Sequence, residues 1–485
     1  AATRSKSIAY DELLHITGGV TAWQRHDYRL LPANGNLPQR VCGLPVVVMG
    51  CRLPPANDRA WRESYDAIVG DQFFFESGND PLTMLTAARA ASSLWSLMLC
   101  LVVWGWSRSI FGRGGGLVSL TLAAFWPAVL AHGPLATSDV CGAAWFTLAA
   151  WMIWQLLHQV SLARVALSGL TIGLALVAKH SAVLLLPVGL LMAGLTLAVN
   201  RPLQLRWRTG QWCLTSRLFR LAVLVALPLL LLPLVLVVIY TFFGFRYATA
   251  SPAYLPQLFP VYPTLADAAQ AAGSLGRFCQ SLGDWRLLPE VWLYGLLHVV
   301  LFGRFRNAFA LGCYSQTGWW WYFPLCLGIK NSLPSLLLLA AGWLRPLISR
   351  RTRIGYECLP LLVIQIVLWP VFLSSHLNIG ERHILPAYPA LIILAGGAWG
   401  LVPRSCRAWR WRWQVVVLAL VGLHAVDVTS RYPHFLSYFN QLVRPGRAHL
   451  WLVDSSLDWG QEMPGLATWL QQHRRESEPI YLDCF

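Results

Sequence analysis

Two adjacent carboxylates stand near the start of the chain, in the segment YDELLHITGG. Asp11 and Glu12 are followed much later by Asp139, which ends the polar stretch PLATSD just before an apolar run. If loops bring these three acids to one face, one carboxylate can accept the proton of a hydroxyl group while a second orients the base or the acceptor. Acids of this kind also cap helices, because the helix dipole favours a negative charge at the N-terminus. The spacing alone does not choose between the two roles.

Five basic residues interrupt apolar stretches elsewhere. Lys179 and His180 form a short turn in LALVAKHSAVLLLP, Lys330 is embedded in PLCLGIKNSLPSLLLL, and Arg382 and His383 lie in NIGERHILPAYP. An ionisable group at membrane depth is costly, so a functional role is the default hypothesis, although Lys179 could also snorkel to the headgroups. Together these cations could clamp a phosphate, with Arg offering two parallel hydrogen bonds and Lys a point charge. A phosphate on a lipid tail would lie at this depth.

The composition indicates where these residues must be held. Of the 485 residues 56% are hydrophobic and only 12% are charged, with a mean hydropathy of +0.50. These values predict an all-α polytopic membrane protein. The net charge of +16 does not predict nucleic-acid binding, because the basic residues fall in short loops between apolar runs and not on one face.

Ten apolar runs are long enough to cross a bilayer of about 30 Å. They lie at residues 84–107, 115–132, 140–158, 164–178, 181–199, 220–242, 319–343, 357–376, 384–402 and 413–429.

The arginines predict the orientation of these spans, because cytoplasmic loops retain Lys and Arg. When the loops are numbered alternately, one side carries Arg108, Arg113, Arg164, Arg201, Arg206, Arg208, Arg217, Arg220, Arg345, Arg350, Arg351, Arg353, Arg404, Arg407, Arg410 and Arg412. We assign that side to the cytoplasm. Every acidic motif named above then lies on the outer side of the membrane.

The spans divide the chain into five parts. We expect a first outer segment at 1–83 with the acidic pair and interfacial helices, core helices at 84–242, a long outer loop at 243–318, further helices at 319–429 and an outer C-terminal segment at 430–485. The alternation favours a missing helix before residue 1. The ending EPIYLDCF reads as a β-strand, so we expect the last segment to be cut short. That segment is expected to help cover or recognise an acceptor.

Seven motifs occur in a characteristic order. They are YDELLHITGGVTAWQRHDYRL, SGNDPLTMLTAARAAS, FWPAVLAHGPLATSDV, GLTIGLALVAKHSAVLLLP, GCYSQTGWWWYFPLCLGIKNSLPSLLLL, NIGERHILPAYPALIILAGGAW and SYFNQLVRPGRAHLWLVDSSLDWGQEM. Over nearly the whole chain this order resembles the bacterial phospholipid-carrier-dependent glycosyltransferases, relatives of the protein O-mannosyltransferases and of the lipid A aminoarabinose transferase. The resemblance implies a GT-C helical bundle with outer loops and a small C-terminal outer segment.

The resemblance also implies roles for single residues. Asp11 matches the first-loop aspartate that acts as general base toward the acceptor, Glu12 its companion, and Asp139 the second-loop aspartate that shapes the site. The implied reaction moves a sugar, with inversion, from a polyprenyl-phosphate donor to an acceptor hydroxyl on the outer side. From charge and position we assign the donor phosphate to Lys179, His180, Lys330, Arg382 and His383.

Several alternatives stay open. Relatives commonly have a PEHPPL-like stretch where this chain has PANGNLPQR at 32–40. The difference would suit an altered acceptor, a weakened enzyme, or an inactive scaffold subunit of a larger membrane complex. A transporter of lipid-linked sugars is a further alternative.

Possible partners and ligands are only broadly defined by the sequence. The acceptor could be a protein, a glycolipid or a glycan, and membrane lipids surround the spans. Asp11, Glu12 and Asp139 could hold a divalent cation by oxygen ligation, although the sequence does not establish a metal. Cys42 and Cys51 could form a disulfide in an oxidising compartment.

Overall fold

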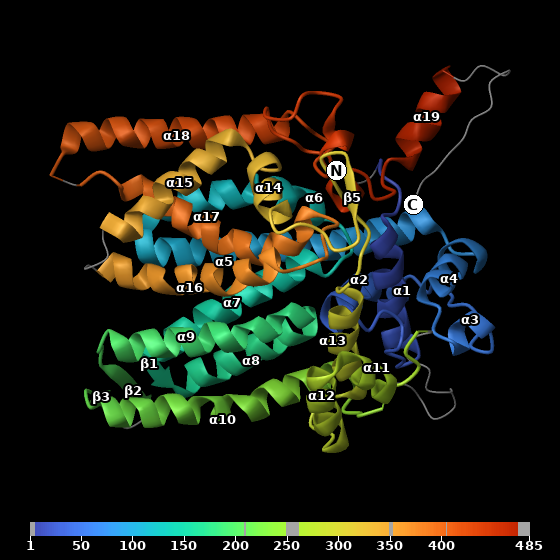
Figure 1. Cartoon of the computed structure of the whole chain (residues 1–485), viewed down its shortest axis with the longest axis horizontal. Coiled ribbons are helices and arrows are strands. Elements are labelled where there is room, and N and C mark those ends of the chain that lie inside the picture. Colours follow the sequence, from blue (N-terminus) through green and yellow to red (C-terminus); the bar gives the residue numbers. More distant parts are fainter. Residues whose placement is uncertain (1–4, 208–209, 249–260, 349–352, 404, 474–485) are drawn as a thin grey trace.

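The computed structural model describes residues 5–207, 210–248, 261–348, 353–403 and 405–473. Long helices run side by side, and smaller elements gather at one end of the bundle (Figure 1). We call this the loop-rich end; it carries α1–α4 and α11–α13. The other end, with the three-stranded sheet β1–β3 and the turn at Gly112, is the arginine end. Outside the described residues lie Arg208, Arg350, Arg351, Arg404 and the strand expected in EPIYLDCF.

The expectation of an all-α, multi-pass membrane protein is confirmed. Seven helical segments among the described residues are long and apolar enough to cross a membrane. They are α5 (Pro81–Ala124), α7 (Asp139–His158), η2 with α9 (His180–Ala198), α10 (Arg217–Phe242), α16 (Arg353–Leu373), η3 with α17 and η4 (Glu381–Gly400) and α18 (Arg407–Thr429). The run expected at 164–178 is a shorter apolar helix, α8 (Leu162–Ala178).

The expected spans at 84–107 and 115–132 form a helical hairpin. Helix α5 begins where Asp80 caps the amide of Leu82, and it breaks at Gly112, whose φ of 76° and ψ of −170° are almost restricted to glycine. The hydroxyl of Ser119 donates to that of Ser107 at 2.8 Å, whereas a straight helix would hold these residues about 18 Å apart. The chain therefore turns back at Gly112 and continues through α6 (Pro127–His132).

The single span expected at 319–343 is instead a sharply bent pair. The chain bends by 113° between helices α14 (Tyr322–Ile329) and α15 (Leu333–Ile348). The break contains Lys330, Asn331 and Ser332, all fully buried. A polar break at this depth requires protein partners, because lipid offers no hydrogen bonds.

The first segment is folded into several short helices. It contains α1 (Tyr10–Gln24), α2 (Asn36–Val48), α3 (Arg59–Arg62), α4 (Asp66–Asp71) and η1 (Gln72–Glu76). Helices α1 and α2 pack so closely that a Cβ on Gly19 would lie 1.9 Å from the carbonyl oxygen of Gln39. Cys42 and Cys51 in this segment are free thiols, so the disulfide is not formed.

The described residues of the expected outer loop at 243–318 form three helices and a short hairpin. It contains α11 (Leu265–Ala272), α12 (Ser274–Asp284), the apolar α13 (Glu290–Phe302) and the hairpin β4 (Ala308–Ala310) and β5 (Cys313–Ser315). Helix α13 is a buried element that the sequence analysis missed. Its side chains pack against α8, α10 and α11 in a second core cluster that includes Trp292, Leu293 and Tyr294.

Two further regions complete the fold. At the arginine end β1 (Gln159–Ser161) pairs parallel with β2 (Leu203–Trp207), which pairs antiparallel with β3 (Gly210–Leu214). At the loop-rich end the C-terminal segment forms η5 (Ala448–Leu450), η6 (Asp454–Ser456) and α19 (Met463–His473). The main core lies between these ends, where α5, α7, α16 and α17 bury large side chains such as Trp106, Trp126 and Trp154.

Candidate active site

Four charged side chains meet at the loop-rich end, and we call them the charge cluster: Asp11, Asp139, Lys179 and Arg382. Arg382 Nη1 donates to Asp11 Oδ2 at 2.6 Å and lies 3.8 Å from Asp139 Oδ2. Lys179 Nζ donates to Asp139 Oδ1 at 2.5 Å. Arg382 therefore links the two aspartates, and Lys179 holds the second one from the other side.

Each member of the charge cluster lies where a helix begins or ends. Asp11 is in the first turn of α1, Asp139 is the first residue of α7, and Lys179 follows the last residue of α8. Arg382 lies in η3, the 3-10 segment Glu381–Ala387. Helix ends have backbone groups without a partner in the helix, so polar side chains are favoured there. Charged residues at four helix ends can therefore meet in one place. Asp139 also accepts a hydrogen bond from the Thr137 hydroxyl at 3.3 Å.

Access to the charge cluster is uneven. Asp11 is 21% exposed and Lys179 19%, whereas Arg382 is 10% and Asp139 only 3% exposed. Asp11 is thus the carboxylate that an acceptor from outside could reach, and Asp139 is held behind it.

Two further acids border Asp11. Burial raises the pKa of Asp66 to about 6, and the charge of Asp11 adds to this rise. Burial also raises the pKa of Asp454 above its ordinary value, although Arg382 opposes the shift. The sequence analysis weighed Asp454 only as a turn residue in the tail and did not consider Asp66. The position of Asp66 beside Asp11 depends on how α4 packs against α1.

Two histidines lie close to the charge cluster, and one of them, His132, is buried. His383, one of the expected phosphate ligands, and His132 are both close enough to Arg382 and Asp139 to interact electrostatically with them. His383 Nε2, both ring nitrogens of His132 and Arg382 Nε are buried and have no hydrogen-bond partner among the described residues. Such groups are costly unless they are satisfied, so these donors and acceptors are available to a ligand. His132 was not singled out from the sequence, because a single histidine after an apolar run carries no motif.

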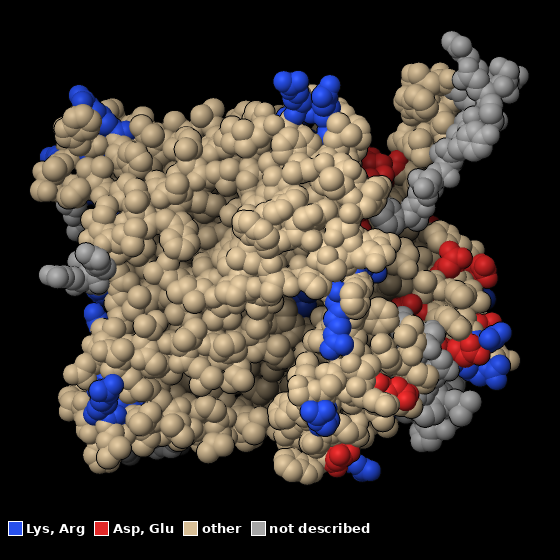
Figure 2. All heavy atoms as spheres, viewed as in Figure 1, with Lys and Arg blue, Asp and Glu red and all other residues tan. Residues whose placement is uncertain are grey.

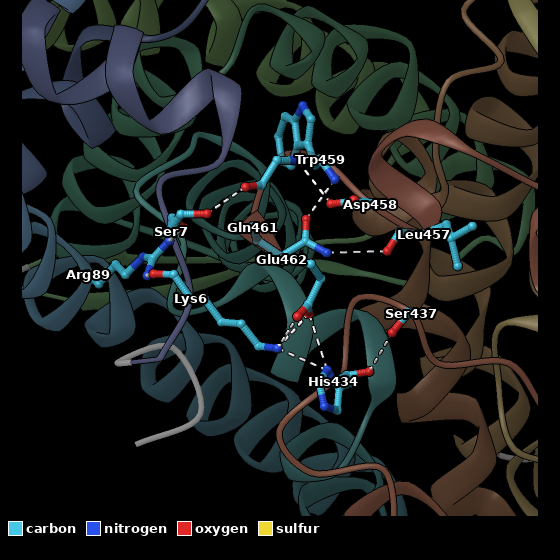
Figure 3. A network of polar contacts seen from close by, with 11 residues as sticks. Lys6, Ser7, Arg89, His434, Ser437, Leu457, Asp458, Trp459, Gln461 and Glu462 are labelled. Atoms are coloured by element: carbon cyan, nitrogen blue, oxygen red, sulfur yellow. Dashed lines mark hydrogen bonds and ion pairs between the residues drawn. The ribbon is translucent and has the colours of Figure 1, made fainter. Parts of the chain in front are cut away.

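The C-terminal segment completes this space through Trp459, whose ring lies 4.0 Å from the Arg382 guanidinium. The N-terminal residues hold the segment in place (Figure 3): Lys6 Nζ donates to both carboxylate oxygens of Glu462, and Ser7 Oγ to the carbonyl of Gly460. Nothing in the sequence separates Trp459 from the other 24 tryptophans, and we missed it.

Glu12 is not brought together with its neighbour Asp11. Its carboxylate is fully buried and accepts hydrogen bonds from Arg89 Nε and Nη2 at 2.9 and 2.6 Å. It also accepts from the backbone amides of Ala9 and Ala136. The reason is helical geometry, since consecutive residues of a helix do not face the same way. Glu12 ties α1 to α5 and to the loop before α7, so it positions the charge cluster without joining it.

His180 also points away from the charge cluster. Its Nε2 donates to the carbonyl oxygen of Pro32 at 3.0 Å, and its ring packs edge-on against Trp292. The altered stretch 32–40 is thereby fixed to the turn that carries Lys179. Asn34 accepts from the Ser138 hydroxyl at 2.8 Å, and a Cβ on Gly35 would lie 2.2 Å from the Ala178 carbonyl oxygen. This stretch supports both Lys179 and Asp139.

Lys330 is separated from the charge cluster as well. It is fully buried at the bend between α14 and α15, where Nζ donates to the carbonyl oxygens of Leu436 and Ser456 at 2.8 and 2.7 Å. Glu381 Oε1 lies 3.7 Å from it. With these partners Lys330 anchors the C-terminal segment to the bundle, and a donor phosphate has no access to it in this arrangement.

The cation site suggested for the three acids is not formed. Among the described residues no group of three or more His, Cys, Asp and Glu side chains is arranged to hold a metal ion. Glu12 is bound to Arg89, and Arg382 already neutralises Asp11 and Asp139. The residues present therefore do not fit a metal.

One family model matches part of the chain. Residues 83–235 match the sequence profile of the dolichyl-phosphate-mannose-protein mannosyltransferases. Over these residues the match confirms the resemblance inferred from the motifs, and it includes Asp139 and Lys179. A search among proteins of curated function found no match.

Remote similarities to solved structures also exist. ArnT from Cupriavidus metallidurans bound to undecaprenyl phosphate is 16% identical with a TM-score of 0.49, and the match covers 86% of this chain and 61% of that one. The Archaeoglobus fulgidus oligosaccharyltransferase in complex with Zn and sulfate is 14% identical with a TM-score of 0.46, covering 87% of this chain and 48% of that one. The chain thus spans between about half and three fifths of these proteins.

Proposed function

We propose that this chain is a GT-C membrane glycosyltransferase that moves a sugar from a polyprenyl-phosphate donor to an acceptor hydroxyl. The observation that carries the proposal is the charge cluster. Residues as far apart as Asp11 and Arg382 place a reachable carboxylate directly beside one cation, and Asp139 links that cation to a second one, Lys179, at the same end of the bundle. The profile match supports the donor class, since that family is described by a lipid-phosphate sugar and a protein acceptor.

In the proposed reaction Asp11 acts as general base. It takes the proton of the acceptor hydroxyl while the acceptor oxygen bonds to C1 of the sugar and the bond from C1 to the phosphate oxygen breaks. The products are the inverted glycoside and the polyprenyl phosphate, which keeps the bonding electrons as negative charge. Lys179 and Arg382 would stabilise that charge as it develops. No metal is needed, because these cations supply the positive charge.

Arg382 gives the site a means of coupling donor and base. In the structure one N–H group of its guanidinium, on Nη1, binds Asp11. Arg382 has five N–H donors in a planar fork and can serve Asp11 and the donor phosphate at once. Its Nε has no partner among the described residues, and His383 and His132 lie beside it. We therefore assign the donor phosphate to Arg382, Lys179 and His383.

The proposal places the charge cluster on the outer side of a bacterial inner membrane and the arginine end in the cytoplasm. It leaves the acceptor as a protein, a glycolipid or a glycan. The segment around Trp459 would contact the acceptor or the sugar, because it lies next to Arg382 at the exposed side of Asp11.

The decisive experiment compares Asp11→Asn with the natural protein in membranes, using labelled polyprenyl-phosphate sugars and counting label in any acceptor. Asparagine keeps the shape and removes the base, so transfer should fall by about a hundredfold or more. Asp71→Asn is the matched control, because Asp71 is an exposed aspartate on α4, and it should leave transfer unchanged.

Two outcomes would overturn the proposal. If both variants transfer as well as the natural protein, Asp11 is not the base. If no membrane transfers label from a broad donor set, the scaffold or transporter alternative replaces the enzyme. A transporter would still move lipid-linked sugar across the membrane of vesicles that contain the Asp11→Asn variant.

A further inference from the structure

A second polar pocket lies at the arginine end of the bundle. Its volume is about 380 Å³, and Arg164, Arg201, Arg353, His158 and Glu357 are among its lining residues. Helix α7 connects it to the charge cluster, since Asp139 is the first residue of that helix and His158 the last. A helix of 20 residues is about 30 Å long, so the two sites lie at opposite ends of one membrane span.

The pocket is held in shape by the short sheet and by helix ends. Gln159 in β1 pairs with Gln204 in β2, which joins the turn between α7 and α8 to the connection between α9 and α10. Arg164 Nη1 donates to the carbonyl oxygens of Gln155 and Gln159 at 2.7 and 3.3 Å. Among the described residues the side-chain hydrogen bonds of Arg164 use Nη1 alone, so Nη2 and Nε remain available as donors.

The second arginine is oriented by an aromatic ring. The Arg201 guanidinium lies 4.1 Å from the centroid of Tyr356, a ring that is only 5% exposed. Stacking engages the face of the guanidinium and leaves the N–H groups on its edge to bind an oxyanion. An arginine held in this way loses less side-chain entropy on binding than a free one.

The charge balance of the pocket favours an anion. Three arginines face a single carboxylate, Glu357. That carboxylate already accepts from Trp154 Nε1 at 2.9 Å and lies 3.4 Å from His158 Nε2. Its charge is therefore directed into the bundle, and the arginines dominate the opening.

We propose that this pocket binds a phosphate group. Arginine forks match phosphate oxygens, the volume suits a small polar ligand, and basic pockets between membrane helices on the cytoplasmic side are known to hold lipid headgroups. The phosphate can belong to an anionic lipid or to a soluble phosphate, and the two sources are separable by experiment. The simpler account is that these arginines only fix topology, which requires charge but no binding geometry.

The test uses the purified full chain in nanodiscs of phosphatidylcholine. One arm replaces part of the lipid with phosphatidylglycerol and measures lipid retained by native mass spectrometry. The other adds inorganic pyrophosphate and measures the shift of the melting temperature against sodium chloride of equal ionic strength, because a ligand that binds the folded state raises it. A response in the first arm alone identifies a lipid headgroup, and one in the second a soluble phosphate.

Variants decide whether the pocket is responsible. Arg164→Gln combined with Arg201→Gln should weaken binding about tenfold or more, because each removes a charge-assisted hydrogen bond. Arg412→Gln is the control, since Arg412 is exposed at the same end and also faces an aromatic ring, Trp409. Arg201→Lys keeps the charge but not the fork and should bind with intermediate strength. The proposal is overturned if neither arm responds, or if the double variant binds as well as Arg412→Gln.

Discussion

Neighbouring carboxylates in the first helix divide two tasks between them. Asp11 faces Arg382 and is partly exposed, while Glu12 turns inward to Arg89 and two backbone amides. The split follows from helix geometry, because a step of one residue rotates a side chain by about 100°. An acidic pair written as two letters in the sequence is therefore one candidate base and one structural anchor.

The anchor role of Glu12 gives a prediction that separates it from Asp11. Glu12→Gln should lower the free energy of unfolding by about 3 to 5 kcal/mol, because it leaves the buried Arg89 charge uncompensated. The fraction that remains folded should transfer sugar at a rate within a few-fold of the natural protein. Thermal unfolding in detergent, paired with transfer per folded molecule, measures both. Glu76→Gln, at an exposed glutamate of η1, is the control and should change stability by no more than about 0.5 kcal/mol.

A stable Glu12→Gln protein that has lost transfer would contradict this assignment. Such a result would show that Glu12 takes part in the reaction as the companion of Asp11, which is the role that the sequence predicted.

Part of the site could be predicted from single residues and part could not. Asp11 and Asp139 stood out as carboxylates on one predicted face, and Lys179 and Arg382 as charges beside apolar runs, where they are costly; the structure brings these four together. Lys330 satisfied the same criterion, yet its partners are backbone carbonyls of residues 436 and 456, which no pattern of side chains reveals. For the same reason Trp459 could not be distinguished, since its contact with Arg382 depends on how the C-terminal segment folds back.

At the scale of elements, the apolar runs predicted the long helices and one of the two sharp bends. The turn at Gly112 falls between the spans expected at 84–107 and 115–132, whereas the break at Lys330 lies inside a run that reads as one span. A buried polar triplet marks that second break only after the fold is known. Similarly, α13 is too short to be recognised as a span and was read as loop.

The element that closes the site is the C-terminal segment, and Glu462 attaches its later part, next to Trp459, to Lys6. Burial alone would raise the pKa of this carboxyl, but hydrogen bonds from Lys6 and His434 outweigh burial and hold the pKa below its ordinary value. A depressed pKa in the folded state means that the interaction stabilises above the unfolded pKa of about 4.3 and is lost as the pH falls through the folded value. Acid should therefore release the segment before it unfolds the bundle.

Hydrogen-exchange protection of residues 434–462, corrected for the intrinsic rate at each pH, measures this release. We expect full protection at neutral pH and a loss confined to this segment below about pH 4. Lys6→Gln should give the same loss at neutral pH, because it removes the main partner of Glu462. Arg447→Gln, at an exposed arginine of the same segment, is the control. Protection that is indifferent to both acid and Lys6→Gln would show that other contacts hold the segment.

At the scale of the whole molecule, the charged side chains gather toward the ends of the helical bundle and leave its middle apolar (Figure 2). In the view of Figure 2 the middle of the bundle is almost free of charged side chains, and the acidic groups that are visible lie over the loop-rich end. The arginine end carries the second pocket. Cations able to bind an anion therefore lie at both ends of the bundle, in the charge cluster at one end and in the pocket at the other. Spans with an apolar middle and unequal ends fit a bilayer in one orientation, because positive loops are retained in the cytoplasm.

Three native cysteines can test that orientation. Cys313 is exposed in β5 at the loop-rich end, while Cys213 in β3 and Cys406 before α18 are exposed at the arginine end (Figure 1). In sealed right-side-out vesicles a membrane-impermeant maleimide should modify Cys313, whereas Cys213 and Cys406 should react only after permeabilisation, because thiol reactivity requires access. Mass spectrometry of the labelled peptides reads out each site, and Cys313→Ser removes the outer signal. If Cys213 and Cys406 react in sealed vesicles while Cys313 does not, the charge cluster faces the cytoplasm, and a donor and acceptor on the outer side are excluded with it.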